Sequence, residues 1–123
     1  MRVLSLCSGY GGLELALSKA LPGLDLNLTA TCDNYGPARD VLRGHWPEAR
    51  QFKDVHDTDL DSMSADIVTF GFPCQDLSRA GNGAGLRGSR SYLFFRCAEI
   101  GHLSGARALI IENVPQALKY RGA

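Results

Sequence analysis

The chain has 123 residues, no net formal charge, 45% hydrophobic residues and 21% charged residues, a composition typical of one globular domain with a single core. No apolar run reaches membrane-spanning length, and Gly9 interrupts the amino terminus too early for a secretory leader, so we expect a cytoplasmic protein without membrane partners. The cysteines are widely spaced and form no Cys-x-x-Cys pair, which argues against a metal site and against disulfides.

The first predicted strand, residues 2–6, leads through a glycine-rich turn into a helix over residues 13–21. The expected buried face of this helix consists of Leu13, Ala16, Leu17, Ala20 and Leu21. Glycines in the turn let the backbone approach a ligand closely, and the helix amino terminus offers unpaired N–H groups. The pattern is Gly-x-Gly-Gly rather than Gly-x-Gly-x-x-Gly, so the dinucleotide fingerprint is not matched.

The second predicted strand, residues 26–32, ends in Asp33, and a third lies near residues 51–55. Between them we expect a helix over residues 35–45, capped by Asn34, with Val41 and Leu42 facing inward. An acid that closes the second strand can accept hydrogen bonds from ribose hydroxyls, and Asp54 could accept one from an adenine amino group. The glycine turn and the two aspartates, in this order, favour a site for an adenosine-containing cofactor. The alternatives are that the glycines form only a tight turn and that the aspartate at the strand end only caps a helix.

The fourth predicted strand, residues 66–71, is followed by Pro73-Cys74-Gln75. The carboxyl end of a parallel strand is where open α/β sheets bind ligands, and Pro73 would hold Cys74 on a stiff turn. This position suits a nucleophile, although most free cysteines only fill space in a core.

A segment rich in glycine and arginine spans residues 78–90 and precedes a predicted helix over residues 91–103. It belongs to the basic half of the chain, since residues 1–66 carry ten acidic and six basic side chains, whereas residues 67–123 carry three and seven. A stripe expected to contact phosphate is formed by Arg79, Arg87, Arg90 and Arg96. The alternative is a solvated charged loop, and a domain that gripped duplex DNA alone would be more basic overall.

The fifth predicted strand, residues 108–111, ends in Glu112-Asn113-Val114, after which Pro115 could open another helix. Strands that alternate with helices predict one α/β domain with a parallel sheet in the order 3-2-1-4-5. Because nothing in the sequence would cover the sheet beyond the fifth strand, we expect a sheet truncated before its last strands.

Together these motifs resemble the C5-cytosine-specific DNA methyltransferases, which have a Rossmann-like fold and use S-adenosylmethionine. Residues 6–12 resemble the first motif of that family, and Gly71-Phe72-Pro73-Cys74-Gln75 resembles its catalytic motif. Residues 88–94 resemble the segment that follows the mobile loop, and Glu112-Asn113-Val114 matches the Glu-Asn-Val motif. The likeness extends through nearly the whole chain.

The resemblance implies that Cys74 adds to C6 of a cytosine flipped out of duplex DNA and that Glu112 contacts N3 and the amino group. It implies that S-adenosylmethionine is bound by Cys7, Ser8, Gly9, Gly11, Gly12, Asp33, Asp54, Val55 and Pro73. It places the loop and DNA contacts at Gln75, Ser78, Arg79, Arg87 and Arg90. It implies no metal ion.

The sequence departs from the family pattern at two places in the first motif. Ser5 stands where an acid is usual, and Cys7 stands where a phenylalanine packs beside the cofactor. A cysteine buries less apolar area, so binding is expected to weaken by about 1–2 kcal/mol unless another side chain fills the gap.

The family's Gln-x-Arg-x-Arg motif, target-recognition region and closing helix are not found in the sequence. We therefore expect residues 1–123 to be a partial catalytic domain that associates with DNA in the nucleoid and is inactive alone. It is expected to be either a truncated product or one half of a split enzyme that a second chain completes. A non-catalytic cofactor-binding fragment and a tRNA cytosine-5 methyltransferase are the alternative hypotheses.

Overall fold

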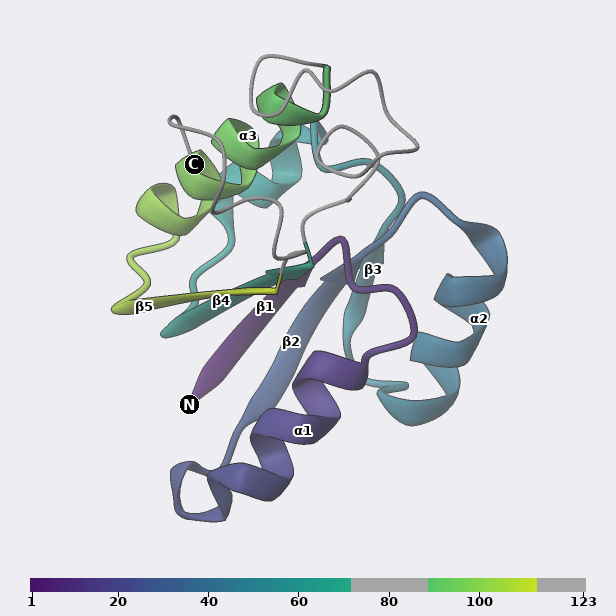
Figure 1. Cartoon of the computed structure of the whole chain (residues 1–123), viewed down its shortest axis with the longest axis vertical. Helices are drawn as coiled ribbons and strands as arrows, with labels where there is room; N and C mark the ends of the chain where they lie inside the picture. Colours follow the sequence, from purple (N-terminus) through teal and green to yellow (C-terminus); the bar gives the residue numbers. More distant parts are fainter. Residues whose placement is uncertain (72–88, 113–123) are drawn as a thin grey trace.

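The computed structural model describes residues 1–71 and 89–112, with the side chains of residues 89–91 left out. Its strands are β1 (Arg2–Leu6), β2 (Asn27–Cys32), β3 (Arg50–Phe52), β4 (Ile67–Gly71) and β5 (Ala108–Glu112). Its helices are α1 (Gly12–Ala20), α2 (Gly36–His45) and α3 (Ser89–Leu103), with 3-10 turns η1 (Pro22–Leu24) and η2 (Thr58–Ser62). Figure 1 shows the helices packed around one twisted sheet.

The sheet has the strand order β3-β2-β1-β4-β5, and every neighbouring pair of strands is parallel. The predicted order 3-2-1-4-5 is therefore confirmed. In the register, Leu6 lies opposite Cys32 and Phe70, and Gly71 lies opposite Glu112. Because parallel strands end at the same edge, the glycine turn after β1, Asp33 after β2, Gly71 and Glu112 adjoin one edge of the sheet, at the upper side of Figure 1.

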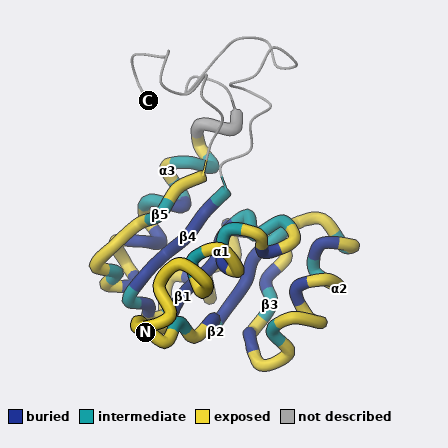
Figure 2. Tube along the Cα trace, turned by 60° about the horizontal axis from the view of Figure 1, so that its bottom comes forward, coloured by how far each residue is buried: buried dark blue, intermediate teal, exposed yellow. Residues whose placement is uncertain are grey.

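One face of the sheet is apolar and is covered by α3 and η2. Side chains that alternate along β1 and β4, such as Leu6 and Phe70, pack there against Cys97 and Ile100 of α3 and Leu60 of η2. These side chains are at most 1% exposed, so this layer is the main hydrophobic core. Figure 2 shows the buried stretches running along the central strands while much of the helix surface is exposed.

The opposite face is covered by α1 and by Trp46 at the end of α2, and it changes character along the strands. Near the amino ends of the strands, this face carries a small apolar cluster of Val3, Leu28 and Ile67. One step nearer the carboxyl edge, the registered neighbours Thr31, Ser5 and Thr69 form a row of buried hydroxyl side chains. Period-two alternation in β1 thus places leucines on one face and polar groups on the other.

The structure corrects the predicted helix faces. In α1 the buried side chain is Glu14, at 5% exposure, whereas Leu13 and Leu17 are only half-buried. The remaining members of the predicted face are exposed: Ala16, Ala20 and Leu21. Helix α1 meets the sheet at a polar row, so its contact face is centred on a carboxylate rather than on an apolar stripe.

Helix α2 also differs from the prediction. Tyr35, not Asn34, precedes its first turn, and no side chain caps it. Val41 is exposed, because Ala38 and Leu42, four residues apart, form the buried side of this helix. Strand β3 ends at Phe52, so Asp54 and Val55 lie in the loop that follows rather than in the strand. No helix in the described residues is long and apolar enough to cross a membrane.

Candidate functional site

The turn between β1 and α1 brings three left-handed backbone positions to the carboxyl edge of the sheet. The φ angles are 50° at Cys7, 56° at Gly9 and 83° at Gly11. A Cβ on Gly11 would lie 2.4 Å from Trp46 Cζ3, so packing against α2 requires glycine there. A Cβ on Gly9 would meet nothing within 4 Å, so at this position the left-handed backbone, not packing, favours glycine.

Asp33 connects the end of β2 to this glycine turn. Its Oδ2 accepts a hydrogen bond from the Gly9 amide at 2.7 Å, and its Oδ1 accepts one from the Tyr35 amide at 2.9 Å. Arg39 of α2 donates to the Asp33 carbonyl at 3.0 Å. Each carboxylate oxygen can accept more than one hydrogen bond, so these contacts orient Asp33 without using up its capacity to bind hydroxyl groups.

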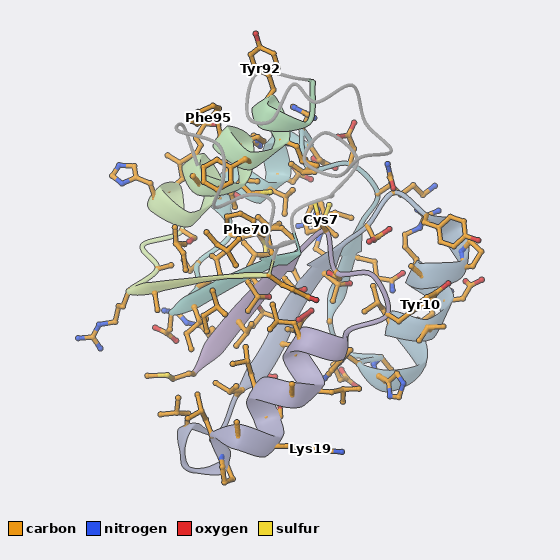
Figure 3. The ribbon with its side chains drawn as sticks, in the orientation of Figure 1. Cys7, Tyr10, Lys19, Phe70, Tyr92 and Phe95 are labelled. Carbon is orange, nitrogen blue, oxygen red and sulfur yellow. The ribbon has the colours of Figure 1, made fainter. Side chains whose placement is uncertain are left out.

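A cavity of about 660 Å³ opens at this edge, within the size range of small-molecule sites. The predicted residues that line it include Cys7, Gly9, Asp33, Asp54 and Val55. Ser8 and Gly11 lie in the turn and Gly12 begins α1, and none of the three lines the cavity. The rest of the wall consists of Cys32, Asn34, Arg39, Lys53, His56, Gly71 and Leu93. Figure 3 shows Cys7 at the carboxyl ends of the strands, with Tyr10 extending towards α2 and Lys19 at the distant end of α1.

The cavity wall includes four residues that were not predicted from the sequence: Arg39, Lys53, His56 and Leu93. Leu93 of α3 is half-buried and lines the same cavity as Cys7. It therefore supplies apolar surface near the position where the family usually has phenylalanine. The basic side chains come from α2 and from the loop after β3, and their sequence positions carry no motif that could have predicted this role.

Asp54 is held in a local turn by its neighbour. Its Oδ1 accepts hydrogen bonds from the His56 amide at 2.8 Å and from the His56 ring at 3.1 Å. The backbone bond and then the ring bond lower the pKa of Asp54 below its ordinary value. Asp54 therefore presents a carboxylate at the cavity wall, as an acceptor for an amino group requires.

A buried polar cluster lies between the glycine turn and α1. Ser5 Oγ donates to Glu14 Oε1 at 2.7 Å and is also 2.7 Å from Ser8 Oγ. Burial raises the pKa of Glu14, and the charge of Glu112 raises it further, against the lowering effect of the Ser5 bond. The sequence contains a signal for the burial of Glu14, because this residue shares the helical spacing of Leu17 and Leu21, but the signal is ambiguous.

Glu112 ends β5 on the face of the sheet that Ser5 and Thr69 occupy. Its Oε2 lies 3.9 Å from the place where a Cβ of Gly71 would be, and the Cys7 carbonyl lies 3.2 Å from the same point. Glu112 is thus beside the residue that leads into the catalytic motif and close to the glycine turn. The absence of a side chain on Gly71 leaves room for this approach.

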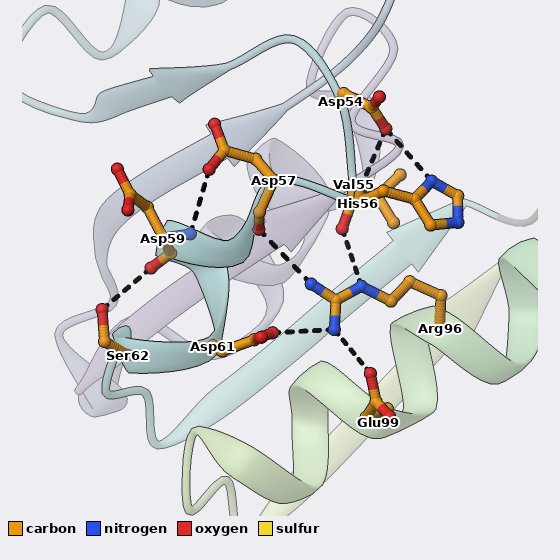
Figure 4. Close-up of polar contacts among 9 residues, drawn as sticks. All are labelled: Asp54, Val55, His56, Asp57, Asp59, Asp61, Ser62, Arg96 and Glu99. Atoms are coloured by element: carbon orange, nitrogen blue, oxygen red, sulfur yellow. Dashed lines mark hydrogen bonds and ion pairs between the residues drawn. The ribbon is translucent and has the colours of Figure 1, made fainter.

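Arg96 is not part of a phosphate-binding stripe, and this prediction is wrong. Its side chain is 11% exposed, and it crosses from α3 to the segment between β3 and η2 (Figure 4). Nε donates to the Val55 carbonyl at 2.9 Å and Nη2 to the Asp57 carbonyl at 3.3 Å. Nη1 pairs with Asp61 at 2.7 Å and with Glu99 at 2.5 Å. Arg96 therefore holds the cavity wall at Val55 against α3.

The environments of Cys32 and Cys97 suppress the ionisation of their thiols. Burial raises the pKa of Cys32 to about 12. A hydrogen bond with Cys7, followed by burial, raises the pKa of Cys97 well above its ordinary value. Thiolates are the reactive form of cysteine, so Cys32 and Cys97 are structural residues.

Several predicted residues lie outside the described residues: Pro73, Cys74, Gln75, Ser78, Arg79, Arg87 and Asn113. The backbone of Arg90 is in α3, but its side chain is not described. Their assigned roles stay predictions.

The parallel sheet, the glycine turn and the cavity at the carboxyl edge define a Rossmann-like α/β domain of the ligand-binding type. Comparison with known sequences gives the family. The sequence model for C-5 cytosine-specific DNA methylase matches residues 1–122. The chain therefore belongs to the C5-cytosine-specific DNA methylase family, as the resemblance of its motifs predicts.

Two curated relatives are similar over almost the whole chain. The Type II methyltransferase M2.BsuMI of Bacillus subtilis (strain 168) is 36% identical over 97% of this chain and 30% of its own length. The Type II methyltransferase M.NgoBI of Neisseria gonorrhoeae is 36% identical over 92% of this chain and 34% of its own length. The chain thus spans about a third of the length of these relatives.

Solved structures agree with the fold. The S. pombe Dnmt2 methyltransferase matches 98% of this chain and 38% of its own, with a TM-score of 0.70 and 23% identity. A Spodoptera frugiperda DNMT2 mutant matches 98% of this chain and 38% of its own, with a TM-score of 0.68 and 22% identity. The predicted α/β methyltransferase fold is confirmed.

Proposed function

We propose that this chain binds S-adenosylmethionine at the carboxyl edge of its sheet and carries the nucleophile of a DNA (cytosine-5-)-methyltransferase. The observation that carries the proposal is the position of Glu112. Its carboxylate lies beside Gly71, three residues before Cys74, and Gly71 lines the cavity that also contains Gly9 and Asp33. The acid, the cavity and the residue that precedes the proposed nucleophile-bearing segment therefore adjoin one another.

The residues at the edge suit this cofactor. A cavity of about 660 Å³ is large enough for an adenosyl amino acid, and Asp33 offers carboxylate oxygens for ribose hydroxyls. We assign Asp54 and Val55 to the adenine end, and Cys7, Ser8, Gly9, Gly11, Gly12 and Pro73 to the methionine end. The bound cofactor supplies an electrophilic methyl group on a sulfonium.

The reaction needs covalent activation, because C5 of cytosine is a weak nucleophile. Addition of the Cys74 thiolate to C6 makes C5 enamine-like, and Glu112 stabilises the developing charge through N3 and the amino group. The cofactor, held by the glycine turn and Asp33, would supply its methyl group to C5 and would leave as a thioether. The C5 proton would pass to water, and the electron pair of the C5–H bond would expel the Cys74 thiolate from C6 and restore the ring.

The base must leave the double helix to reach this edge. We assign contacts with the extruded base or the DNA backbone to Gln75, Ser78, Arg79, Arg87 and Arg90, which follow Cys74 in sequence. Arg96 is left out of this group because its guanidinium is already bonded to η2 and the preceding loop.

The names of the curated relatives favour DNA over RNA as the substrate, since both are Type II methyltransferases of a DNA methylase family. Because the chain spans about a third of their length, we propose that turnover requires further polypeptide, for instance a second chain. Cofactor binding by this chain is a separate property that can be measured directly.

The test combines methyl transfer with covalent capture. We expect Cys74→Ser to abolish transfer to DNA and capture of 5-fluorocytosine DNA in every assembly where the wild-type chain supports them. Cys97→Ser, at a buried thiol that does not line the cavity, should keep both wherever the variant folds. Transfer to tRNA but not to DNA would assign the substrate to RNA. Cofactor binding without methyl transfer in any assembly would show that the chain is a cofactor-binding fragment without catalysis. Retained activity in Cys74→Ser would remove Cys74 from the mechanism.

A further inference from the structure

Strand β5 has the sequence of a buried strand but lies exposed at an edge of the sheet. Its residues are apolar up to Glu112, yet Leu109 and Ile111 are each 43% exposed. The neighbouring strand β4 is buried from Ile67 to Phe70, and Figure 2 shows it beside the largely exposed β5. Consecutive apolar residues are typical of parallel strands that are covered on both faces, so β5 has the sequence of an interior strand.

The strand register shows which layer of the protein these exposed side chains continue. Leu109 lies opposite Val68 and Ile111 lies opposite Phe70, and both β4 residues belong to the core under α3. Leu109 packs on the backbone of α3, because a Cβ on Gly101 would clash with its side chain. The core layer under α3 therefore extends to this edge of the sheet and is left uncovered there. We call Leu109 and Ile111 the apolar strip.

The opposite edge of the sheet, at β3, has the features that discourage further strand pairing. β3 has only three residues, and two of them are the polar residues Arg50 and Gln51. Arg50 pairs with Asp59 at 2.8 Å and lies over the Phe52 ring at 4.6 Å, while Gln51 donates to the Arg39 carbonyl at 2.7 Å. Proteins protect exposed sheet edges with short strands and charged side chains. β5 is longer, and its one charged side chain is at its last position.

The lengths of the relatives indicate what covers this edge. Within the described residues, β5 pairs with β4 alone, so its outer backbone edge has no partner strand in that part of the chain. The chain matches only 30% of M2.BsuMI, 34% of M.NgoBI and 38% of the S. pombe Dnmt2 structure. Proteins that contain this unit of the fold therefore have at least as much polypeptide again that can lie against it.

We propose that the outer edge of β5 and the apolar strip bind the polypeptide that completes the methylase domain, which adds a strand beside β5 and covers Leu109 and Ile111. This inference rests on the proposed function and specifies where the further polypeptide binds. The main-chain hydrogen bonds of an added strand provide affinity, and its apolar side chains bury the strip. Because Glu112 ends β5, the added strand lies next to the proposed catalytic acid, which accounts for the need for it in turnover.

The test uses the 123-residue chain and, as the probe, the part of M2.BsuMI outside its match to this chain, expressed as a second polypeptide. We expect an equimolar complex with the wild-type chain, measured by sedimentation and titration. Ile111→Lys places a charge in the apolar strip and should weaken this complex by about tenfold or more. Val41→Lys, at a side chain 38% exposed on α2, is the matched control and should change the affinity less than about twofold.

Hydrogen exchange on the wild-type chain gives a readout that needs no variant. We expect the β5 amides that point away from β4 to exchange fast in the chain alone and to be protected in the complex. Protection in the chain alone would mean that a second copy or residues 113–123 cover the strip, and would overturn the proposal. Absence of a complex, or equal affinity in wild type and Ile111→Lys, would overturn it as well.

Cofactor calorimetry on the same chain separates this inference from the proposed function. Binding of S-adenosylmethionine without formation of the complex would keep the cofactor site and reject the docking surface. A complex that depends on Ile111 but neither binds the cofactor nor transfers methyl groups would keep the docking surface and reject the proposed function.

Discussion

The two faces of the sheet bury different kinds of side chain. The face under α3 buries leucine, phenylalanine and cysteine side chains with almost no exposure, whereas the face under α1 buries hydroxyl groups and a carboxylate. Both buried side-chain atoms without a partner in the described part of the chain, Glu14 Oε2 and Thr69 Oγ1, are on the α1 face.

The two faces therefore make different contributions to stability. Apolar burial contributes about 25 cal/mol per Å², so the α3 face favours folding without any further component. Unpaired buried polar atoms, by contrast, oppose folding. The predictions below test this division, from the largest expected effect to the smallest.

The strongest test of the apolar face is Phe70→Ala. Phe70 is 1% exposed and makes an edge-to-face contact with Phe94 at 5.9 Å between ring centroids. We expect a loss of about 3–5 kcal/mol in the free energy of unfolding, measured by urea denaturation. Phe95→Ala, at a side chain 57% exposed on α3, is the control and should cost less than about 1 kcal/mol.

The contact between α3 and the cavity wall is tested by Arg96→Gln. Loss of hydrogen bonds to two backbone carbonyls and two carboxylates should lower the free energy of unfolding by about 1–3 kcal/mol. Binding of the folded variant to DNA should have the same salt dependence as that of the wild type. A weaker dependence of DNA affinity on salt concentration in the variant would mean that Arg96 does contact phosphate.

The polar face is tested by comparing two threonines. Thr69→Val removes a hydroxyl without a partner and should leave stability unchanged or raise it by about 1 kcal/mol. Thr29→Val removes a hydroxyl that donates to the Val3 carbonyl at 3.2 Å and should lower stability by about 1 kcal/mol. Equal destabilisation in chemical denaturation would mean that Thr69 is satisfied in the folded protein.

The pH dependence of Glu14 gives the smallest effect. Its pKa is raised in the folded protein, so the associated stability is fully present below the ordinary carboxyl pKa of 4.5 and is lost as pH rises through the folded pKa. We expect wild type to lose stability relative to Glu14→Gln as pH increases from 4 to about 8. A difference that stays constant over this range would contradict the raised pKa.

The strand positions and their order could be predicted because buried parallel strands have continuous apolar sequences and because crossovers have a fixed hand. Helix faces were less predictable. In α1 both Leu13–Leu17 and Glu14–Leu17 have helical spacing, and only the polar row on the sheet determines which side faces inward.

Arg96 illustrates the second limit of sequence reasoning. In sequence it follows the other arginines, which predicted a phosphate contact. In the helix, Cys97 and Ile100 face the core, and Arg96 and Glu99 therefore face η2. The pairing with Asp61 and with the Val55 carbonyl joins segments about forty residues apart and has no local sequence signal.

The central claim is that the carboxyl edge of the sheet binds S-adenosylmethionine, and amide chemical-shift mapping of the isotopically labelled chain tests it most directly. On titration with the cofactor, we expect saturable shifts that cluster at Gly9, Gly11, Asp33 and Asp54, with little change at Lys19 and Leu103. A folded chain whose amides do not shift, or whose shifts gather at the opposite ends of the strands, would contradict the account.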